Sequence, residues 1–180
     1  MFPTIGFAGN IALVVATSQC RRVGIQVNRL IALTCALDGI HQLGHPILIW
    51  NIFSRSTVSM ETCFWFQVIP LFGLHGGMIS MMCLGVDRYL AFNASWYIRR
   101  HASKRLAADT ALIVVYATCM IALAWSSLDN RDTVCLIGTV MHGKAETIWL
   151  MISMIIYILS TAMFAATYHK LKNKSDHLCL

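Results

Sequence analysis

The triplet Asp87-Arg88-Tyr89 follows a long stretch of sequence without charge, since no charged residue lies between Glu61 and Asp87. An arginine keeps its charge and carries five hydrogen-bond donors, so it can exchange one set of acceptors for another. Neighbours on a helix point in different directions, so Asp87 and Arg88 need not be each other's only partners. The triplet therefore indicates either a conformational switch or an interfacial charge that anchors the helix.

A second acid, Asp38, lies inside another apolar stretch. A charge at the centre of a membrane helix costs about 2.5–3.5 kcal/mol, so such residues face the protein interior and are functional candidates. Asn10 is a candidate partner, because an amide inside a membrane also needs a hydrogen bond. The alternative is a structural aspartate that is protonated or hydrogen-bonded.

Three histidines are candidates for metal binding by their positions in the sequence. His41 and His45 are four residues apart and share a helix face, and His75 is expected on a neighbouring helix. No carboxylate or cysteine completes a metal shell, so we interpret them as interior hydrogen-bonding histidines and predict no metal site. The chain also has no nucleophile–base arrangement of the kind enzymes use, so we do not expect an enzyme.

The elements that position these residues follow from composition. Hydrophobic residues make up 57% of the chain and charged residues 12%, against about 25% charged in an ordinary globular protein. Apolar runs of about 18 residues or more predict membrane helices. The sequence therefore predicts an all-α, multi-pass membrane helix bundle of one domain, residues 1–180, with Pro46 kinking the second helix. The predicted spans are residues 4–20, 30–53, 63–86, 107–128 and 146–169.

Basic residues indicate the orientation. Eleven of the 14 lysines and arginines fall after the first, third and fifth spans, and only Arg55, Arg131 and Lys144 fall on the other side. Cytoplasmic loops carry the excess of basic residues, so we expect the amino terminus outside and the carboxyl terminus in the cytoplasm. The net charge of +6 then reflects topology and contact with anionic lipid headgroups, and gives no case for nucleic acid.

Cys63 and Cys135 are the cysteines placed on the outer side of the membrane by this topology. Disulfides persist in oxidising compartments, so we expect a bond between them that ties the outer loop to the third helix. The alternative is two free thiols.

Taken in order, these elements resemble the rhodopsin-like (class A) G-protein-coupled receptors, and within them the nematode serpentine chemoreceptors of the srsx group. The segments "GFAGN" and "NRLIALTCALDGIHQLGHP" are similar to the first and second helices of that family, and "DRYLAFNASWY" is similar to its second cytoplasmic loop. The spacing from Cys63 to the triplet also resembles the family's. The further matching positions are Gly9, Asn10, Asn28, Asp38, Pro46, Cys135 and Tyr168.

The resemblance implies a plasma-membrane receptor for an external chemical cue, a small molecule or peptide, coupled to a heterotrimeric G protein. Arg88 would contact the G protein, Asp87 would restrain it at rest, and Tyr89 and Tyr168 would lie at the same coupling end. Asp38, with Asn10, would lie in the family's pocket for water and a sodium ion. The residues implied to line the ligand cavity are Gln67, Pro70, Leu71, Leu74 and His75.

The chain also departs from the family pattern. Segments like the family's sixth-span Cys-Trp-x-Pro and seventh-span Asn-Pro-x-x-Tyr have no counterpart, and the sequence ends at "KNKSDHLCL". Gly77 stands where many members have a serine. We therefore expect a receptor truncated after its fifth helix that does not signal alone. The alternative is a truncated membrane protein that pairs with full-length relatives and modulates them.

Overall fold

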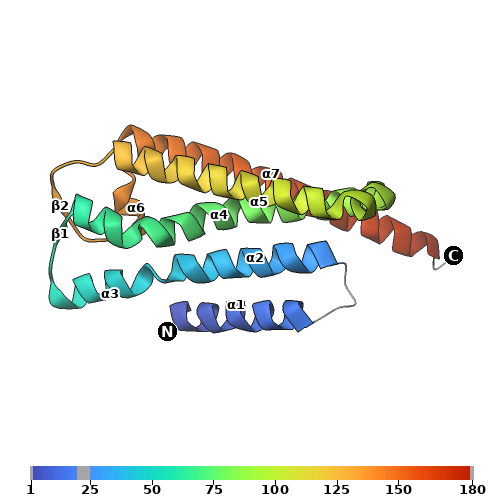
Figure 1. The fold of residues 1–180 in the computed structure, drawn as a ribbon, viewed down its shortest axis with the longest axis horizontal. Coiled ribbons are helices and arrows are strands. Elements are labelled where there is room, and N and C mark those ends of the chain that lie inside the picture. Colours follow the sequence, from blue (N-terminus) through green and yellow to red (C-terminus); the bar gives the residue numbers. More distant parts are fainter. Residues whose placement is uncertain (1, 20–24, 179–180) are drawn as a thin grey trace.

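The computed structural model describes the backbone of residues 2–19 and 25–178 (Figure 1). The end of the first predicted span at Cys20 and the basic pair Arg21-Arg22 lie outside these residues. The described chain is helical apart from loops and two short strands, as the predicted all-α fold requires. Its elements are α1 (Phe2–Gln19), α2 (Ile25–Gln42), α3 (His45–Ser54), β1 (Val58–Ser59), α4 (Met60–Asn93), α5 (Ser95–Ser126), β2 (Asp132–Thr133), α6 (Ile137–Val140) and α7 (Lys144–Leu178).

Helix α4 is the centre of the bundle (Figure 1). Helices α2, α5 and α7 pack along it, and α1 packs along α2. The contact between α5 and α7 is small. Three of the described helices are long and apolar enough to cross a membrane, and they cover Met60–Asn93, Arg100–Ser126 and Lys144–Lys172. A shorter apolar helix covers Ile5–Thr17. The chain is therefore a membrane protein.

The second predicted span is divided into two helices, so the expected kink is a break. Helix α2 ends at Gln42, and the amides of Leu43 and Gly44 bond to carbonyls three residues earlier, which tightens the last turn. Pro46 lies in the first turn of α3, where a missing amide hydrogen costs little. Gln67 of α4 donates its side-chain amide to the Gly44 carbonyl at 3.4 Å, which attaches the break to the central helix.

Glycines allow α2 and α4 to approach closely near the middle of the bundle. A Cβ atom at Gly73 would lie 2.5 Å from the backbone nitrogen of His41 and 2.6 Å from the carbonyl oxygen of Leu37. Real Cβ atoms do not come this close to backbone, so the contact requires glycine at this position.

One end of the bundle is held by covalent and backbone contacts, and we call it the disulfide end. Cys63 at the start of α4 is bonded to Cys135, which confirms the predicted disulfide. Strand β1 pairs antiparallel with β2, with Val58 opposite Thr133. The Ser59 hydroxyl accepts a hydrogen bond from the amide of Thr62 and so caps α4. The loop before α7 is thereby fixed against the first turn of the central helix.

Candidate functional site

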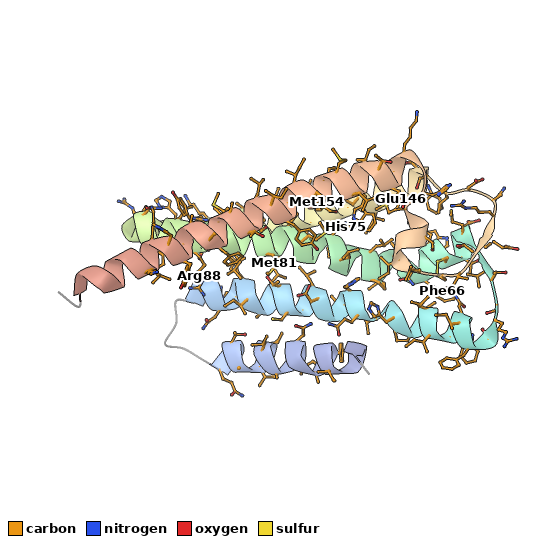
Figure 2. All side chains as sticks on the ribbon, turned by 180° about the vertical axis from the view of Figure 1, so that it is seen from behind. Phe66, His75, Met81, Arg88, Glu146 and Met154 are labelled. Atoms are coloured by element: carbon orange, nitrogen blue, oxygen red, sulfur yellow. A yellow bond between two sulfur atoms is a disulfide. The ribbon has the colours of Figure 1, made fainter. Side chains whose placement is uncertain are left out.

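The predicted switch residues lie at the opposite end of α4, which we call the Arg88 end. Figure 2 shows Phe66, His75 and Arg88 following one another along this helix from the disulfide end. Asp87 has no exposed surface, whereas Arg88 and Tyr89 are half-buried. Tyr168, on α7, is 68% exposed. The structure thus brings the triplet together on one helix end, and gives Tyr168 an open surface.

A charge cluster surrounds Asp87. Arg105 of α5 and the adjacent Arg88 both lie within electrostatic range of its carboxylate. Asp109, one helical turn further along α5, interacts with Arg105 and also with the side chain of Cys83. Asp87 therefore has two cationic neighbours, one of them on a different helix.

Asp109 and Arg105 were not identified as site residues from the sequence. Asp109 lies inside the predicted span 107–128, and the rule that singled out Asp38 applies to it equally: an ionisable residue within a membrane span is a functional candidate. Arg105 lies just before that span, so only its proximity to Asp87 in the folded chain reveals it.

Helix α7 contacts the end of α4 through Lys170. The Lys170 ammonium donates a hydrogen bond to the side-chain carbonyl of Asn93 and lies 4.8 Å from the centre of the Tyr89 ring. Asn93 in turn donates to the Tyr89 carbonyl at 3.0 Å. A cation over an aromatic face is attracted to it, so Lys170 connects α7 to the last turn of α4.

The two residues of the predicted interior pocket, Asp38 and Asn10, lie in different surroundings. A Cβ atom at Gly77 would lie 2.8 Å from the Asp38 carboxylate oxygen, so the carboxylate occupies the space next to this glycine. Asn10 lines a different cavity, of about 350 Å³, between α1 and α2. No hydrogen bond between the two is found among the described residues.

Asp38 supplies the carboxylate for the sodium site that the resemblance implies. The neighbouring Gly77 has no side-chain oxygen, and the hydroxyls of Thr34 and Ser80 bond to each other at 2.6 Å. The sodium site stays a prediction.

The implied ligand residues on α4 are mostly covered. Gln67, Leu71 and His75 have no exposed surface, Pro70 is buried and Leu74 is half-buried. The ring of His75 meets Tyr116 of α5 and Trp149 of α7, with ring centres 6.1 and 6.3 Å apart.

These three rings carry polar atoms without hydrogen bonds. Both ring nitrogens of His75, the hydroxyl of Tyr116 and the indole nitrogen of Trp149 are buried and have no partner in the described part of the chain. Buried polar groups are normally paired, and exceptions need an explanation such as water or a ligand. The cluster was not predicted beyond His75 itself.

The remaining histidines do not form a metal centre. The rings of His41 and His45 meet edge to face with their centres 5.6 Å apart. Among the described residues, no group of three or more histidines, cysteines or acids is placed to hold a metal ion.

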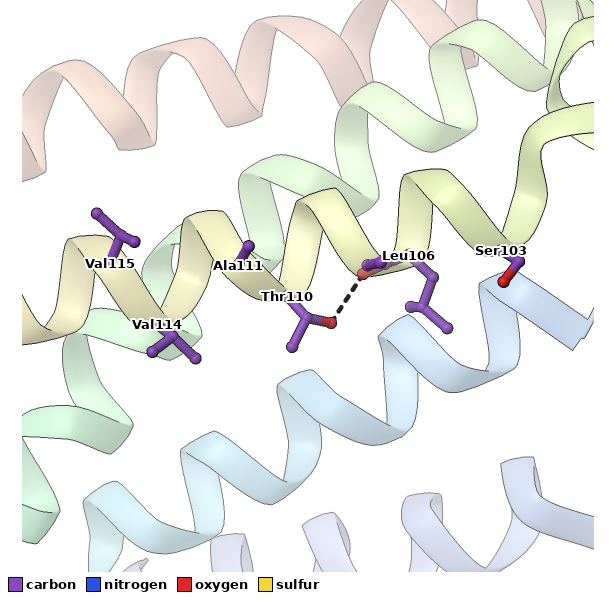
Figure 3. A pocket seen from close by; sticks show the side chains of 7 residues that line it. Ser103, Leu106, Thr110, Ala111, Val114 and Val115 are labelled. Carbon is purple, nitrogen blue, oxygen red and sulfur yellow. Dashed lines mark hydrogen bonds between the residues drawn. The ribbon is translucent and has the colours of Figure 1, made fainter.

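A cavity of about 680 Å³ lies along one face of α5, shown in Figure 3. All its lining residues belong to α5, and its hydroxyl at Thr110 already donates to the Leu106 carbonyl at 2.8 Å. Apart from Thr110 and Ser103, the lining residues are apolar, so lipid is a sufficient occupant for this face.

Comparison with known proteins identifies one family. A family model described as "Serpentine type 7TM GPCR chemoreceptor Srsx" matches residues 3–178. A comparison with curated proteins found none that matches. The match spans nearly all of the chain and confirms the family that the motifs predict.

Proposed function

Because the chain belongs to the Srsx family of serpentine chemoreceptors, we propose that it detects an external chemical cue and couples to a heterotrimeric G protein through its Arg88 end. The family is one of receptors and not of enzymes. The proposed location is the plasma membrane, with the disulfide end outside and the Arg88 end in the cytoplasm, as the distribution of basic residues indicates.

The observation that carries the coupling proposal is the surroundings of Asp87. The carboxylate is fully buried and has Arg105 within range as well as Arg88. A buried charge needs a partner, and Arg105 can remain that partner when Arg88 moves. Arg88 can therefore leave Asp87 for acceptors on a G protein without leaving an unpaired carboxylate behind.

Tyr89 and Tyr168 complete the proposed coupling surface. Lys170 holds α7 against Tyr89 and Asn93, so a shift of α7 changes the surroundings of the triplet. In this proposal Tyr168 is the exposed contact on α7. An aromatic ring with a polar tip suits such an interface, because one part packs while the hydroxyl hydrogen-bonds.

The proposed ligand cavity lies further toward the disulfide end and includes Gln67, Pro70, Leu71, Leu74 and His75. The unpaired nitrogens of His75, together with Tyr116 and Trp149, support this location. A ligand group or water that reached them would supply hydrogen bonds that the described residues do not. The cluster touches α4, α5 and α7, so occupancy there can move the helices that carry the coupling surface.

The coupling proposal is tested by G-protein activation in cells that express the full chain, alone or with a full-length Srsx relative, and are exposed to a panel of odorants. A response of the chain expressed alone that Arg88→Ala abolishes and that Lys104→Ala, the same loss of charge at an exposed position of α5, leaves intact would support the coupling role. The same response would contradict the expectation that this chain does not signal alone. Surface abundance is measured for every variant.

The outcomes separate the two functions. A change in the relative's surface abundance that persists in Arg88→Ala, with no G-protein response, would favour the alternative of a receptor-interacting membrane protein. A response that is equal in wild type and Arg88→Ala would contradict the coupling role of the triplet.

A further inference from the structure

A cavity of about 380 Å³ lies at the disulfide end, apart from the ligand positions implied on α4. Its walls come from α3, from the segment leading into β1, from α4 and from the disulfide cysteine Cys135. It contains none of the five positions from Gln67 to His75. Its volume is within the range of about 300–1,000 Å³ that is usual for small-molecule sites.

The walls are apolar and present aromatic surface. Pro46, Ile47 and Trp50 come from α3, Val58 from β1 and Phe66 from α4. The side chain of Trp50 is 72% exposed and that of Phe66 57% exposed. A molecule between them would remove this aromatic area from its surroundings, which is a large source of binding free energy.

The wall contains a buried asparagine whose amide nitrogen lacks a hydrogen bond among the described residues. Asn51 is only 5% exposed, and its amide nitrogen is buried without a partner in the described part of the chain. The hydroxyl of Ser56, which also lines the cavity, is already paired with Ser54 at 2.6 Å. A buried amide without a hydrogen bond is costly, so the side chain of Asn51 offers a binding contact that nothing else in the wall uses.

Backbone hydrogen bonds fix the end of α3, which carries Asn51. The Asn51 carbonyl accepts a hydrogen bond from the backbone amide of Ser56 at 3.2 Å, and Arg55 ends the helix in the left-handed conformation with φ of 48°. The adjacent strand β1 is fixed by its pairing with β2. The backbone of two of the cavity walls is therefore held by hydrogen bonds within the chain.

We propose that this cavity binds a small, largely aromatic or aliphatic molecule that carries one hydrogen-bonding group, and that the side-chain amide of Asn51 pairs with that group. The amide can donate or accept, because its oxygen and nitrogen occupy equivalent positions. A lipid acyl chain would cover the apolar walls but leave the amide unpaired. The site takes its biological meaning from the proposed chemoreceptor function, but its test measures binding alone, so either can fail without the other.

The test uses two photoreactive probes on the full chain in lipid nanodiscs. One is a benzyl alcohol that carries a trifluoromethyl diazirine on its ring, and the other is the same compound with methyl in place of the hydroxymethyl group. Mass spectrometry measures labelling of peptides that contain Trp50 or Phe66, relative to a peptide around Met154 on an exposed face of α7. That ratio corrects for partition of each probe into lipid.

We expect the alcohol to label the cavity more strongly than the hydrocarbon, and Asn51→Leu to remove this excess, a change of about three- to tenfold for one hydrogen bond. Asn130→Leu, the same substitution at an exposed position in the loop before β2, should leave the excess unchanged. Trp50→Ala, at an exposed position, should lower labelling by both probes. It serves as the second variant if Asn51→Leu does not fold.

Three results would overturn the inference. One is equal labelling by the two probes, which would make the cavity a lipid-facing groove. Another is an excess for the alcohol that survives in Asn51→Leu. The third is labelling of the cavity that Trp50→Ala leaves unchanged for both probes.

Discussion

At the scale of single residues, Asp87 combines full burial with several charged neighbours at the Arg88 end. It is fully buried, and Arg88, Arg105 and Asp109 all lie near enough to interact with it or with one another. Two acids that share one arginine from α5 cannot both be fully compensated by it. The adjacent Arg88 is a second cation near Asp87.

We predict that Asp87→Ala lowers the free energy of unfolding by about 3 kcal/mol, because it removes a buried carboxyl group that interacts electrostatically with Arg105 and Arg88. Asp129→Ala, at an exposed acid in the loop before β2, should change it by less than about 0.5 kcal/mol. Unfolding by sodium dodecyl sulfate in mixed micelles measures both.

A double-mutant cycle locates the partner of Asp87. If Arg105 is that partner, Asp87→Ala and Arg105→Met should show a coupling of about 1–3 kcal/mol. Strict additivity of the two substitutions would show that Arg105 does not stabilise the carboxylate.

At the scale of elements, the α2–α4 contact decides where the site residues lie. Gly73 lets the two backbones touch, and one turn further along α4 Gly77 makes room for the carboxylate of Asp38. The break between α2 and α3 then redirects the chain, and Gln67 attaches the break to α4. Asn51 and Trp50 therefore lie on α3, a helix separate from α2.

Gly73→Ala tests this contact. The added Cβ would meet the backbone of α2, which cannot move aside as a flexible side chain can, so we expect a loss of about 1–3 kcal/mol in the free energy of unfolding. Gly9→Ala is the matched control, because a Cβ there meets nothing within 4 Å. In a helix this control should be neutral or stabilising by up to about 1 kcal/mol. Equal stability of Gly73→Ala and wild type would show that the helices can separate at little cost.

At the scale of the whole molecule, the two ends of the bundle differ in chemistry. The disulfide end has a covalent bond, a pair of strands and a cluster of buried apolar residues around Cys63 and Cys135. The Arg88 end has arginines, lysines, the buried Asp87 and the half-buried Asp109. An oxidised end and a basic end are what a receptor needs on the outer and cytoplasmic sides of a membrane.

Orientation is predicted by this difference. In a Cys119→Ser background, Lys144→Cys at the start of α7 should react with a membrane-impermeant maleimide on intact cells. Lys104→Cys at the start of the apolar part of α5 should react only after permeabilisation. Both positions, Lys104 and Lys144, are exposed in the structure and so can be reached by the reagent. The unsubstituted background reports labelling of the remaining cysteines. The reverse pattern would place the Arg88 end outside and remove the basis for G-protein coupling.

The sequence by itself determined the class of this protein. Its apolar runs, the order of Asp38, Cys63 and the Asp87-Arg88-Tyr89 triplet, and the count of basic residues on each side are local features, so they can be read along the chain. They were sufficient to predict a helical membrane bundle, the Cys63–Cys135 disulfide and the chemoreceptor family.

Only the tertiary structure decided which side chains meet. Arg105 lies 18 positions from Asp87 in the sequence, and Lys170 lies still further from Tyr89. Side-chain partners of this kind depend on how helices are rotated and how closely they approach, which is set by glycines such as Gly73 and by the packing of whole faces. Hydrophobic periodicity gives the face of one helix but not the residue it meets on another.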